Sequence, residues 1–329
     1  MKRSRLQQNC VLLASLFLAA AVNATTLSSA TTAGTNFSAA AFRFWSPDGA
    51  GSLRGLVVLV PGSNCDGRWM VEDGFWQDFA RRHEFGLVGC LFKDRPHDNM
   101  NIEEYARASA GSGQALLDAI CEFAARANNP GIADAPLLLW GHSAGGEFNY
   151  EFACWKPERV LAFVVNKGGY YFTHLASAAA RLVPGIFFVG ERDEKFRVDS
   201  IRGLFSVNRE AGALWTLAVE PDVAHEVGKT RELAASYFEA VIALRMAKTL
   251  APANPVAVRA APRYAWTGNV QSLDISPASA DECRDAQTAW LPDGAFARRW
   301  QVFVRGRSAS EDNTAQPATG AEFPSLKAR

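Results

Sequence analysis

The sequence predicts an α/β protein built on a doubly wound, mostly parallel sheet, followed by a small C-terminal appendage. Short apolar segments of strand length alternate along the chain with amphipathic segments of helix length. The strand-like segments are apolar on both faces, as they are when helices cover both sides of a sheet. A chain of 329 residues with 48% hydrophobic and 21% charged residues is large enough for one such domain.

Six segments fit the strands of this sheet because each is a short run of branched, leucine and aromatic residues. In chain order they are LRGLVVLVPG, GLVGCLFKD, PLLLWGHS, VLAFVVNKGG, GIFFVGERD and LWTLAVEPDVAH. Helices are predicted between and after them from apolar stripes. The stripe in GQALLDAICEFAARANN predicts a helix that ends near Asn128, and a second stripe runs through TRELAASYFEAVIALRM. The residues of the two stripes are Leu116, Ile120 and Phe123, then Leu233, Tyr237, Val241 and Leu244.

The first residues have the pattern of a secretory signal peptide. Positive charges at Lys2, Arg3 and Arg5 precede an apolar run that ends at Val22, and Ala24 closes a small-residue cleavage site. The apolar run is about 12 residues long, too short for a bilayer span, which takes roughly 20. We therefore expect a secreted or periplasmic protein that is cleaved after Ala24 and has no membrane span after cleavage.

The composition divides the rest of the chain into three parts. We expect the catalytic domain over residues 25–250, beginning with a Thr/Ala/Ser-rich leader. Residues 251–305 start with a proline- and alanine-rich stretch and are expected to form an appendage docked on the core. Within it, TAWLPDGAFARRWQVF predicts a short helix that packs through Trp290, Phe296 and Trp300. Residues 306–329 are polar and expected to be a loose tail.

Charge and cysteine content exclude several partners. The formal net charge is zero, so nothing indicates binding to nucleic acid or to an anionic membrane. Of the six cysteines, Cys10 lies in the predicted signal peptide, which leaves an odd number of five. At least one thiol is then free, and the favoured disulfide, Cys65 with Cys90, is balanced against buried, unpaired cysteines. No cysteine lies at metal-ligand spacing from a histidine, so no metal site is expected.

The stretch LLLWGHSAGGEF places a serine at the point where a buried strand turns into a helix. Gly141 and Gly145 lie two residues on either side of Ser143. This G-x-S-x-G spacing lets the neighbouring backbone pass without Cβ clashes and leaves the hydroxyl exposed. A tight loop that merely needs small residues is the alternative. With the strand before it and the helix after it, the motif predicts that Ser143 is a nucleophile.

A serine nucleophile needs a base that is held by a carboxylate. Among the histidines only His225 follows the last predicted strand, because His142 belongs to the turn itself and the others lie elsewhere, at His83, His97 and His174. The acid is expected on the loop after the preceding strand, GERDEKF. Asp193 is the first choice there, and Glu191 and Glu194 are the alternatives.

An attacked carbonyl also needs two donors for the developing oxyanion. The backbone N–H of Ala144, at the start of the helix after the nucleophile, is expected to be one. The second is assigned to Ser63 in VLVPGSNCDGR, with Asn64 as the alternative.

Together these segments resemble the α/β-hydrolase superfamily over roughly residues 42–247. The resemblance rests on VPGSNCDGR, GHSAGG, GERD and AHE, and it is closest to secreted bacterial serine esterases that cleave polyesters and feruloyl esters. It implies acyl transfer to Ser143, hydrolysis of the acyl-enzyme by water that His225 activates, and no metal or organic cofactor. The chain departs from the pattern in lacking the H-G-G-G run of some lipases, and Cys65 has no place in it.

The sequence thus predicts a serine esterase whose substrate is a small-molecule or polymeric ester. Only a short segment, Thr173 to Arg181, separates two predicted strands, which leaves no room for a large lid and suggests an open cleft. Tyr170 and Tyr171 follow a strand on the active-site side and are expected to line it. A serine peptidase of the same fold and a noncatalytic binding protein are the alternatives. The peptidases usually carry a large additional domain for which this chain has no room.

Overall fold

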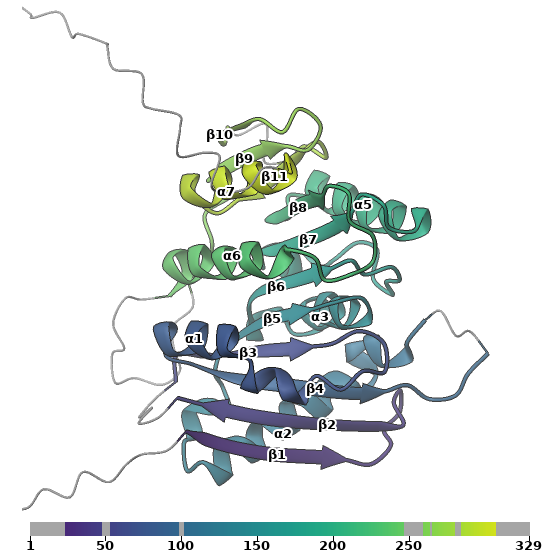
Figure 1. Ribbon diagram of the computed structural model, residues 1–329, viewed down its shortest axis with the longest axis vertical. Helices are drawn as coiled ribbons and strands as arrows, with labels where there is room; N and C mark the ends of the chain where they lie inside the picture. Colours follow the sequence, from purple (N-terminus) through teal and green to yellow (C-terminus); the bar gives the residue numbers. More distant parts are fainter. Residues whose placement is uncertain are drawn as a thin grey trace, which may run out of the picture.

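An eight-stranded sheet forms the centre of the protein (Figure 1). The computed structural model describes residues 24–47, 53–98, 102–246, 259–263, 265–279 and 284–306. The strand order is β1-β2-β4-β3-β5-β6-β7-β8; strands β3 to β8 are parallel, whereas β2 is antiparallel to β4 and β1 to β2. The strands are β1 Thr25–Thr31, β2 Ala39–Ser46, β3 Gly55–Val60, β4 Phe85–Lys93, β5 Leu137–Gly141, β6 Val160–Asn166, β7 Gly185–Gly190 and β8 Trp215–Glu220.

The predicted doubly wound α/β fold is confirmed, and the six predicted strands are β3 to β8. All residues of β3, β5, β6 and β7 are buried, which is why they read as unbroken apolar runs. The sequence did not predict β1 and β2. Strand β1 is an edge strand in which half-exposed and exposed residues alternate over the sequence TTLSSAT, so it carries almost no apolar signal.

Helices cover both faces of the sheet, with α1 and α6 on one face and α2, α3 and α5 on the other (Figure 1). The helices of this domain are α1 Gly74–His83, α2 Ser112–Arg126, α3 Ala144–Trp155, α4 Ala178–Arg181, α5 Lys195–Glu210 and α6 Thr230–Arg245. Short 3₁₀ turns are η1 Arg68–Glu72, η2 Glu104–Ala106, η3 Ala108–Ala110, η4 Pro130–Ile132 and η5 Pro157–Arg159. Both predicted stripes face the core. Helix α2 ends two residues earlier than expected because Asn128 takes a left-handed conformation, with φ of 50°.

A small C-terminal unit packs beside β8 and α6 (Figure 1). It consists of a three-stranded antiparallel sheet, ordered β10-β9-β11, and one helix: β9 Trp266–Asn269, β10 Ile275–Pro277, β11 Thr288–Leu291 and α7 Gly294–Val304. Trp300 is fully buried and its indole N–H donates to the Leu217 carbonyl of β8, 2.8 Å away. Trp290 and Phe296 are buried as well, so the predicted packing residues do pack.

The helix predicted over TAWLPDGAFARRWQVF is shorter than expected. Residues 288–291 form β11, in which every residue is buried, and the helix starts only at Gly294. Asp293 sets this start because its carboxylate accepts a hydrogen bond from the Phe296 N–H at 2.7 Å, an N-cap.

Some expectations from the sequence fall outside the described residues, namely residues 1–23 of the predicted signal peptide and residues 307–329 of the tail. Within the described residues, no helix is both long enough and apolar enough to span a membrane. The favoured disulfide is not formed: Cys65 is a free thiol in an exposed loop, and Cys90 is a free thiol buried in β4. Burial raises the pKa of the Cys90 thiol well above its ordinary value.

Candidate active site

Ser143 occupies a sharp turn between β5 and α3. Its backbone has φ of 54° and ψ of −126°, a conformation that costs a non-glycine residue about 1–3 kcal/mol. The flanking glycines allow the turn. A Cβ atom on Gly141 would lie 2.3 Å from the Gly145 carbonyl oxygen, and one on Gly145 would lie 2.3 Å from the Val60 carbonyl oxygen. Neither position tolerates any other residue without moving backbone, so the whole motif serves to hold the Ser143 hydroxyl at the end of the sheet.

A continuous hydrogen-bond chain joins Ser143, His225 and Asp193. His225 Nε2 lies 3.0 Å from Ser143 Oγ, and its Nδ1 lies 2.9 Å from Asp193 Oδ2. The three residues follow β5, β8 and β7, whose carboxyl ends meet at one edge of the parallel sheet. The Asp193 side chain is 2% exposed and acts as an acceptor, which places the imidazole proton on Nδ1 and leaves Nε2 free to accept the serine proton.

The two alternative acids make other contacts. Glu191 Oε2 accepts the backbone N–H of Asp222 at 2.9 Å, and Glu194 Oε2 pairs with Arg197 at 3.1 Å. Asp193 itself is oriented by the Glu194 N–H, which donates to its second carboxylate oxygen at 2.7 Å. Of the three carboxylates on this loop, the structure thus brings only Asp193 to His225.

His142 supports the loop that carries His225. Its Nε2 lies 2.9 Å from the His225 carbonyl oxygen, which can only accept, so Nε2 carries the proton. Burial lowers the pKa of His142 to about 4, and the ring is therefore neutral near pH 7. The remaining histidines lie away from Ser143: His97 pairs with Asp94 at 2.8 Å, His83 packs against Phe79, and His174 is exposed.

Of the two expected oxyanion donors, one adjoins Ser143 in the chain and the other lines the same cavity. Ala144 is the first residue of α3, and Ser63 lies in the loop after β3 and lines the same cavity as Ser143. Within the described residues, neither backbone N–H has a hydrogen-bond partner in the protein. The alternative, Asn64, is less suited because its N–H donates to the Tyr105 hydroxyl at 3.3 Å.

A buried ion pair that the sequence analysis did not identify lies beneath the His225 loop. Lys167 Nζ lies 2.8 Å from Glu220 Oε2, and the two side chains are 0% and 5% exposed. The second Glu220 oxygen accepts the backbone N–H of Lys229 at 2.6 Å, beyond His225 in the same loop. Asn166, the last residue of β6, also donates to the Val227 carbonyl of this loop at 3.3 Å. The sequence signal for this ion pair was a lysine placed directly after the buried strand β6, which ends in VVN.

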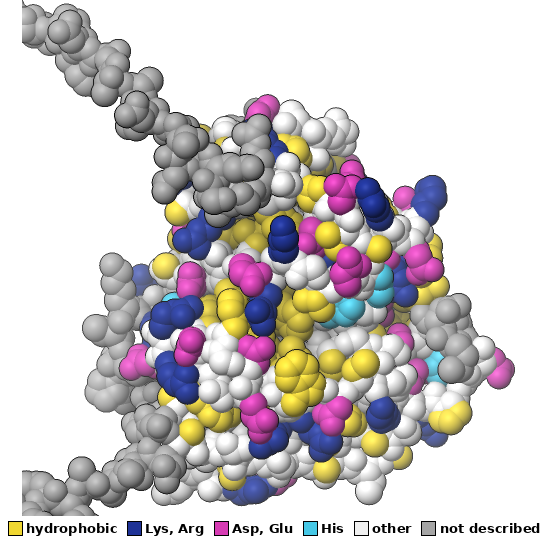
Figure 2. Space-filling model, viewed as in Figure 1, with side chains coloured by type: hydrophobic (Ala, Val, Ile, Leu, Met, Phe, Trp, Pro, Cys, Tyr) yellow, Lys and Arg dark blue, Asp and Glu magenta, His cyan; other side chains and the backbone are white. Residues whose placement is uncertain are grey.

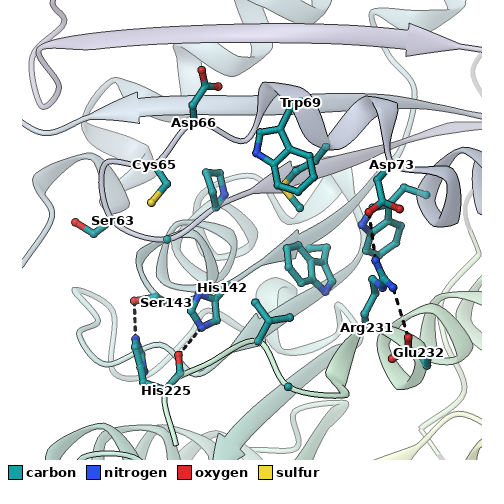
Figure 3. A pocket seen from close by; sticks show the side chains of 17 residues that line it. Ser63, Cys65, Asp66, Trp69, Asp73, His142, Ser143, His225, Arg231 and Glu232 are labelled. Carbon is teal, nitrogen blue, oxygen red and sulfur yellow. Dashed lines mark hydrogen bonds and ion pairs between the residues drawn. The ribbon is translucent and has the colours of Figure 1, made fainter.

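An open cavity of about 760 Å³ starts at Ser143 and runs between the loop after β3 and the start of α6. We call it the tryptophan groove, after Trp69, Trp76 and Trp140 among its lining residues. Figure 3 shows Ser143, His225 and Ser63 at one end and Arg231, Asp73 and Glu232 at the other, with Trp69 between them. On the surface, hydrophobic side chains gather in the middle of the face shown in Figure 2, next to histidine side chains.

Tyr170 and Tyr171, expected to line the cleft, lie elsewhere. They border a separate cavity of about 250 Å³ with His174 and Leu204. The cause is Glu147 on α3, whose carboxylate accepts the N–H groups of Gly169 and Tyr170 at 2.6 and 3.0 Å and turns the chain toward α5. There the Tyr170 ring packs against Phe196. The groove aromatics come instead from β5, η1 and α1, whose sequences gave no hint that they would meet.

Neither a protein-family model nor a curated protein matches this chain. Solved structures do match in fold. A ferulic acid esterase shares 13% identity, with a TM-score of 0.51 over 67% of this chain and 98% of that one. An S-formylglutathione hydrolase from Agrobacterium tumefaciens shares 15% identity (TM-score 0.49; 68% and 96% covered), and a poly(3-hydroxybutyrate) depolymerase from Bordetella parapertussis shares 16% (TM-score 0.46; 65% and 88% covered). At these identities the likeness shows the fold alone, which is the α/β-hydrolase fold.

Proposed function

We propose that this protein is a serine hydrolase that cleaves carboxylic esters through an acyl-enzyme on Ser143. One observation carries the proposal: the hydrogen-bond chain from Ser143 Oγ through His225 to Asp193, at 3.0 and 2.9 Å, opens onto a groove large enough for an organic substrate. The strained backbone of Ser143 supports the same reading, as do the N–H groups of Ser63 and Ala144, which have no hydrogen-bond partner within the described residues.

The proposed reaction begins when Ser143 Oγ attacks the ester carbonyl carbon and its proton passes to His225 Nε2. The carbonyl oxygen becomes an oxyanion, which the N–H groups of Ser63 and Ala144 stabilise. Asp193 stabilises the imidazolium through Nδ1. When the carbon–oxygen bond breaks, the alcohol leaves with the proton from Nε2 and the acyl group stays on Ser143. Water then attacks the acyl carbonyl carbon while His225 Nε2 takes its proton. The bond between the acyl group and Ser143 Oγ breaks, His225 returns the proton to Ser143, and the carboxylic acid leaves.

The signal-peptide pattern supports action outside the cytoplasm, in the periplasm or the medium. The intact mass of protein recovered from the culture medium or periplasm tests this part: we expect a mature chain that begins at Thr25, and a chain that still carries Met1 in the cytoplasm would contradict it.

Turnover of paired substrates tests the chemistry. We expect the protein to hydrolyse p-nitrophenyl acetate, to leave the matching p-nitroanilide almost untouched, and to lose at least about 10⁴-fold in kcat on Ser143→Ala. Ser206→Ala on α5, outside the groove, serves as the matched control. Near-normal ester hydrolysis by Ser143→Ala would refute the assignment. Cleavage of the anilide at the rate of the ester would favour a peptidase, and no turnover of either would favour a binding protein.

A further inference from the structure

The tryptophan groove exposes apolar surface that the protein itself does not cover. Trp69 in η1 is 59% exposed, the largest exposure among the large hydrophobic side chains of the described residues. Val227, on the opposite wall, is 36% exposed. Between them lie Trp76 and Trp140, whose ring centres are 5.7 Å apart. An apolar surface of this kind beside a reactive serine is what a hydrophobic ligand covers.

The groove also contains a donor with no partner. Trp140 is 3% exposed, and within the described residues its indole N–H, fully buried, has no hydrogen-bond partner. A buried donor without a partner is costly, and a ligand oxygen that reached it when the indole turned toward the groove would satisfy it. Because Trp140 lines the groove, the ligand is expected to carry an oxygen acceptor along its length.

The end of the groove far from Ser143 disfavours anions. Asp73 and Glu232 line it, with Arg231 as the one arginine among the residues that line the groove. Arg231 is already engaged, because it lies 3.2 Å from Asp73 and 3.7 Å from Glu232 and stacks over the Phe75 ring at 4.4 Å. A carboxylate on the substrate would therefore meet two carboxylates and a single guanidinium that already pairs with both of them.

We infer that the tryptophan groove selects esters with an extended, uncharged hydrophobic group that carries an oxygen acceptor, and that it rejects groups ending in an anion. The inference rests on the proposed ester hydrolysis at Ser143. The hydrophobic group is either the acyl or the alcohol half of the ester, since both meet at the scissile bond.

Two substrate series test whether the groove binds a hydrophobic group, and they identify which half of the ester, acyl or alcohol, enters the groove. One lengthens the acyl group of p-nitrophenyl esters, and the other lengthens the alcohol of acetate esters. In one series we expect kcat/KM to rise about two- to fourfold per added methylene until the groove is filled. Trp69→Ala is expected to lower the ratio between the longest ester and the acetate about tenfold, whereas Trp69→Phe retains most of it. Leu175→Ala, equally exposed but outside the groove, is the control. No rise in either series, or an unchanged ratio in Trp69→Ala, would overturn the inference.

An ether scan tests the oxygen acceptor. In the series that responds, single methylenes are replaced by ether oxygens at successive positions. At one position we expect kcat/KM to exceed that of its neighbours at least about fivefold, and Trp140→Phe to abolish the difference. The variant's melting temperature shows whether its core survives, and the acetate ester provides an internal reference for each variant. A flat scan in the wild-type protein would remove Trp140 from the recognition.

Esters whose chains end in a carboxylate test the charge. We expect kcat/KM at least about tenfold below that of the methyl-terminated ester of equal length, a gap that narrows on Glu232→Gln and in high salt. Equal or faster cleavage of the anionic ester would contradict the inference that the far end of the groove rejects anions.

Reaction with alkyl fluorophosphonates separates this inference from the proposed function. The rate at which Ser143 is labelled is expected to rise with alkyl length and to lose that dependence in Trp69→Ala. Equal labelling by short and long probes would refute the groove's selectivity and leave the serine hydrolase intact. No labelling of Ser143 by any probe would refute the proposed function itself.

Discussion

His225 is held from three sides, and each contact fixes a different property. Asp193 fixes the proton on Nδ1, Ser143 lies opposite the free nitrogen, and His142 donates to the His225 carbonyl and so fixes the backbone. The sequence predicted the first two contacts from strand order, with Asp193 as the first choice for the acid and Glu191 and Glu194 as the alternatives. It did not predict the third, because nothing in a sequence motif says where a side chain within the turn points.

The identity of the carboxylate that orients His225 gives a first prediction. Asp193→Asn should lower kcat by on the order of 10⁴-fold, because an amide favours the wrong imidazole tautomer and removes the charge that stabilises imidazolium. Glu191→Gln and Glu194→Gln should stay within about tenfold, since both side chains contact groups other than His225. Ester turnover by the three variants measures this. If Glu191→Gln were the inactive variant, the geometry described for this loop would be wrong.

Glu147 gives a prediction about pH. Burial raises the pKa of Glu147 to about 7 from its ordinary 4.5. Between those pH values Glu147 is protonated in the folded protein and ionised in the unfolded chain. Its contribution to the free energy of unfolding therefore falls by about 3 kcal/mol in all as pH rises from 4.5 through 7. Glu147→Gln keeps an oxygen for the Gly169 and Tyr170 N–H groups and should remove this dependence.

Urea unfolding at several pH values measures that difference. The gap in unfolding free energy between wild type and Glu147→Gln should widen in favour of the variant as pH rises from 4.5 to 7, and stay constant at higher pH. Glu194→Gln, an exposed glutamate changed in the same way, is the control. Parallel curves for wild type and Glu147→Gln would mean that Glu147 is ionised without penalty.

Among the elements, the loop from β8 to α6 depends most on a long-range contact, the ion pair between Lys167 and Glu220, which the sequence analysis did not identify. Lys167 ends up beneath it because β6 and β8 stop at the same edge of the sheet, and Glu220 then ties Lys167 Nζ to the Lys229 N–H. The sequence predicted strands β3 to β8 and helices α2 and α6, because their apolar patterns are strong. It missed β1 and β2, and it included the short strand β11 in a helix.

The Lys167–Glu220 pair should therefore act as a positioning device. Lys167→Met and Glu220→Leu should each destabilise the fold by about 3–5 kcal/mol, because each leaves a buried charge without its partner. The double variant should recover most of this stability. Its kcat should stay about tenfold to a hundredfold low with KM little changed, because the Lys229 N–H has lost its acceptor and the His225 loop is displaced.

A purely structural role for the pair makes a different prediction. Thermal melting and ester kinetics of wild type, the two single variants and the double variant decide between a structural and a positioning role. If activity returned together with stability in the double variant, the pair would serve the fold and not the position of His225.

For the whole molecule, the sequence predicts the relative positions of Ser143, His225 and Asp193 better than it predicts the groove beside them. The Ser143, His225 and Asp193 positions follow from strand ends, which a single parallel sheet brings to one edge. The tryptophan groove joins η1, α1, β5 and α6, and no local pattern links these segments, which is why Tyr170 and Tyr171 were wrongly expected to line it. We propose that residues 251–305 form an appendage docked on the core; in its described part, the Trp300 indole N–H donates to the Leu217 carbonyl of β8.

The most direct test of the account is the mass of the protein after reaction with a fluorophosphonate. We predict one adduct per chain, located by peptide mapping on Ser143, formed in the folded protein and absent after heat denaturation and in Ser143→Ala. His225→Ala should slow its formation by several orders of magnitude, because the hydroxyl then has no base. A folded wild-type protein that remained unmodified, or that carried the adduct on a different serine, would contradict the central claim that Ser143 is an activated nucleophile.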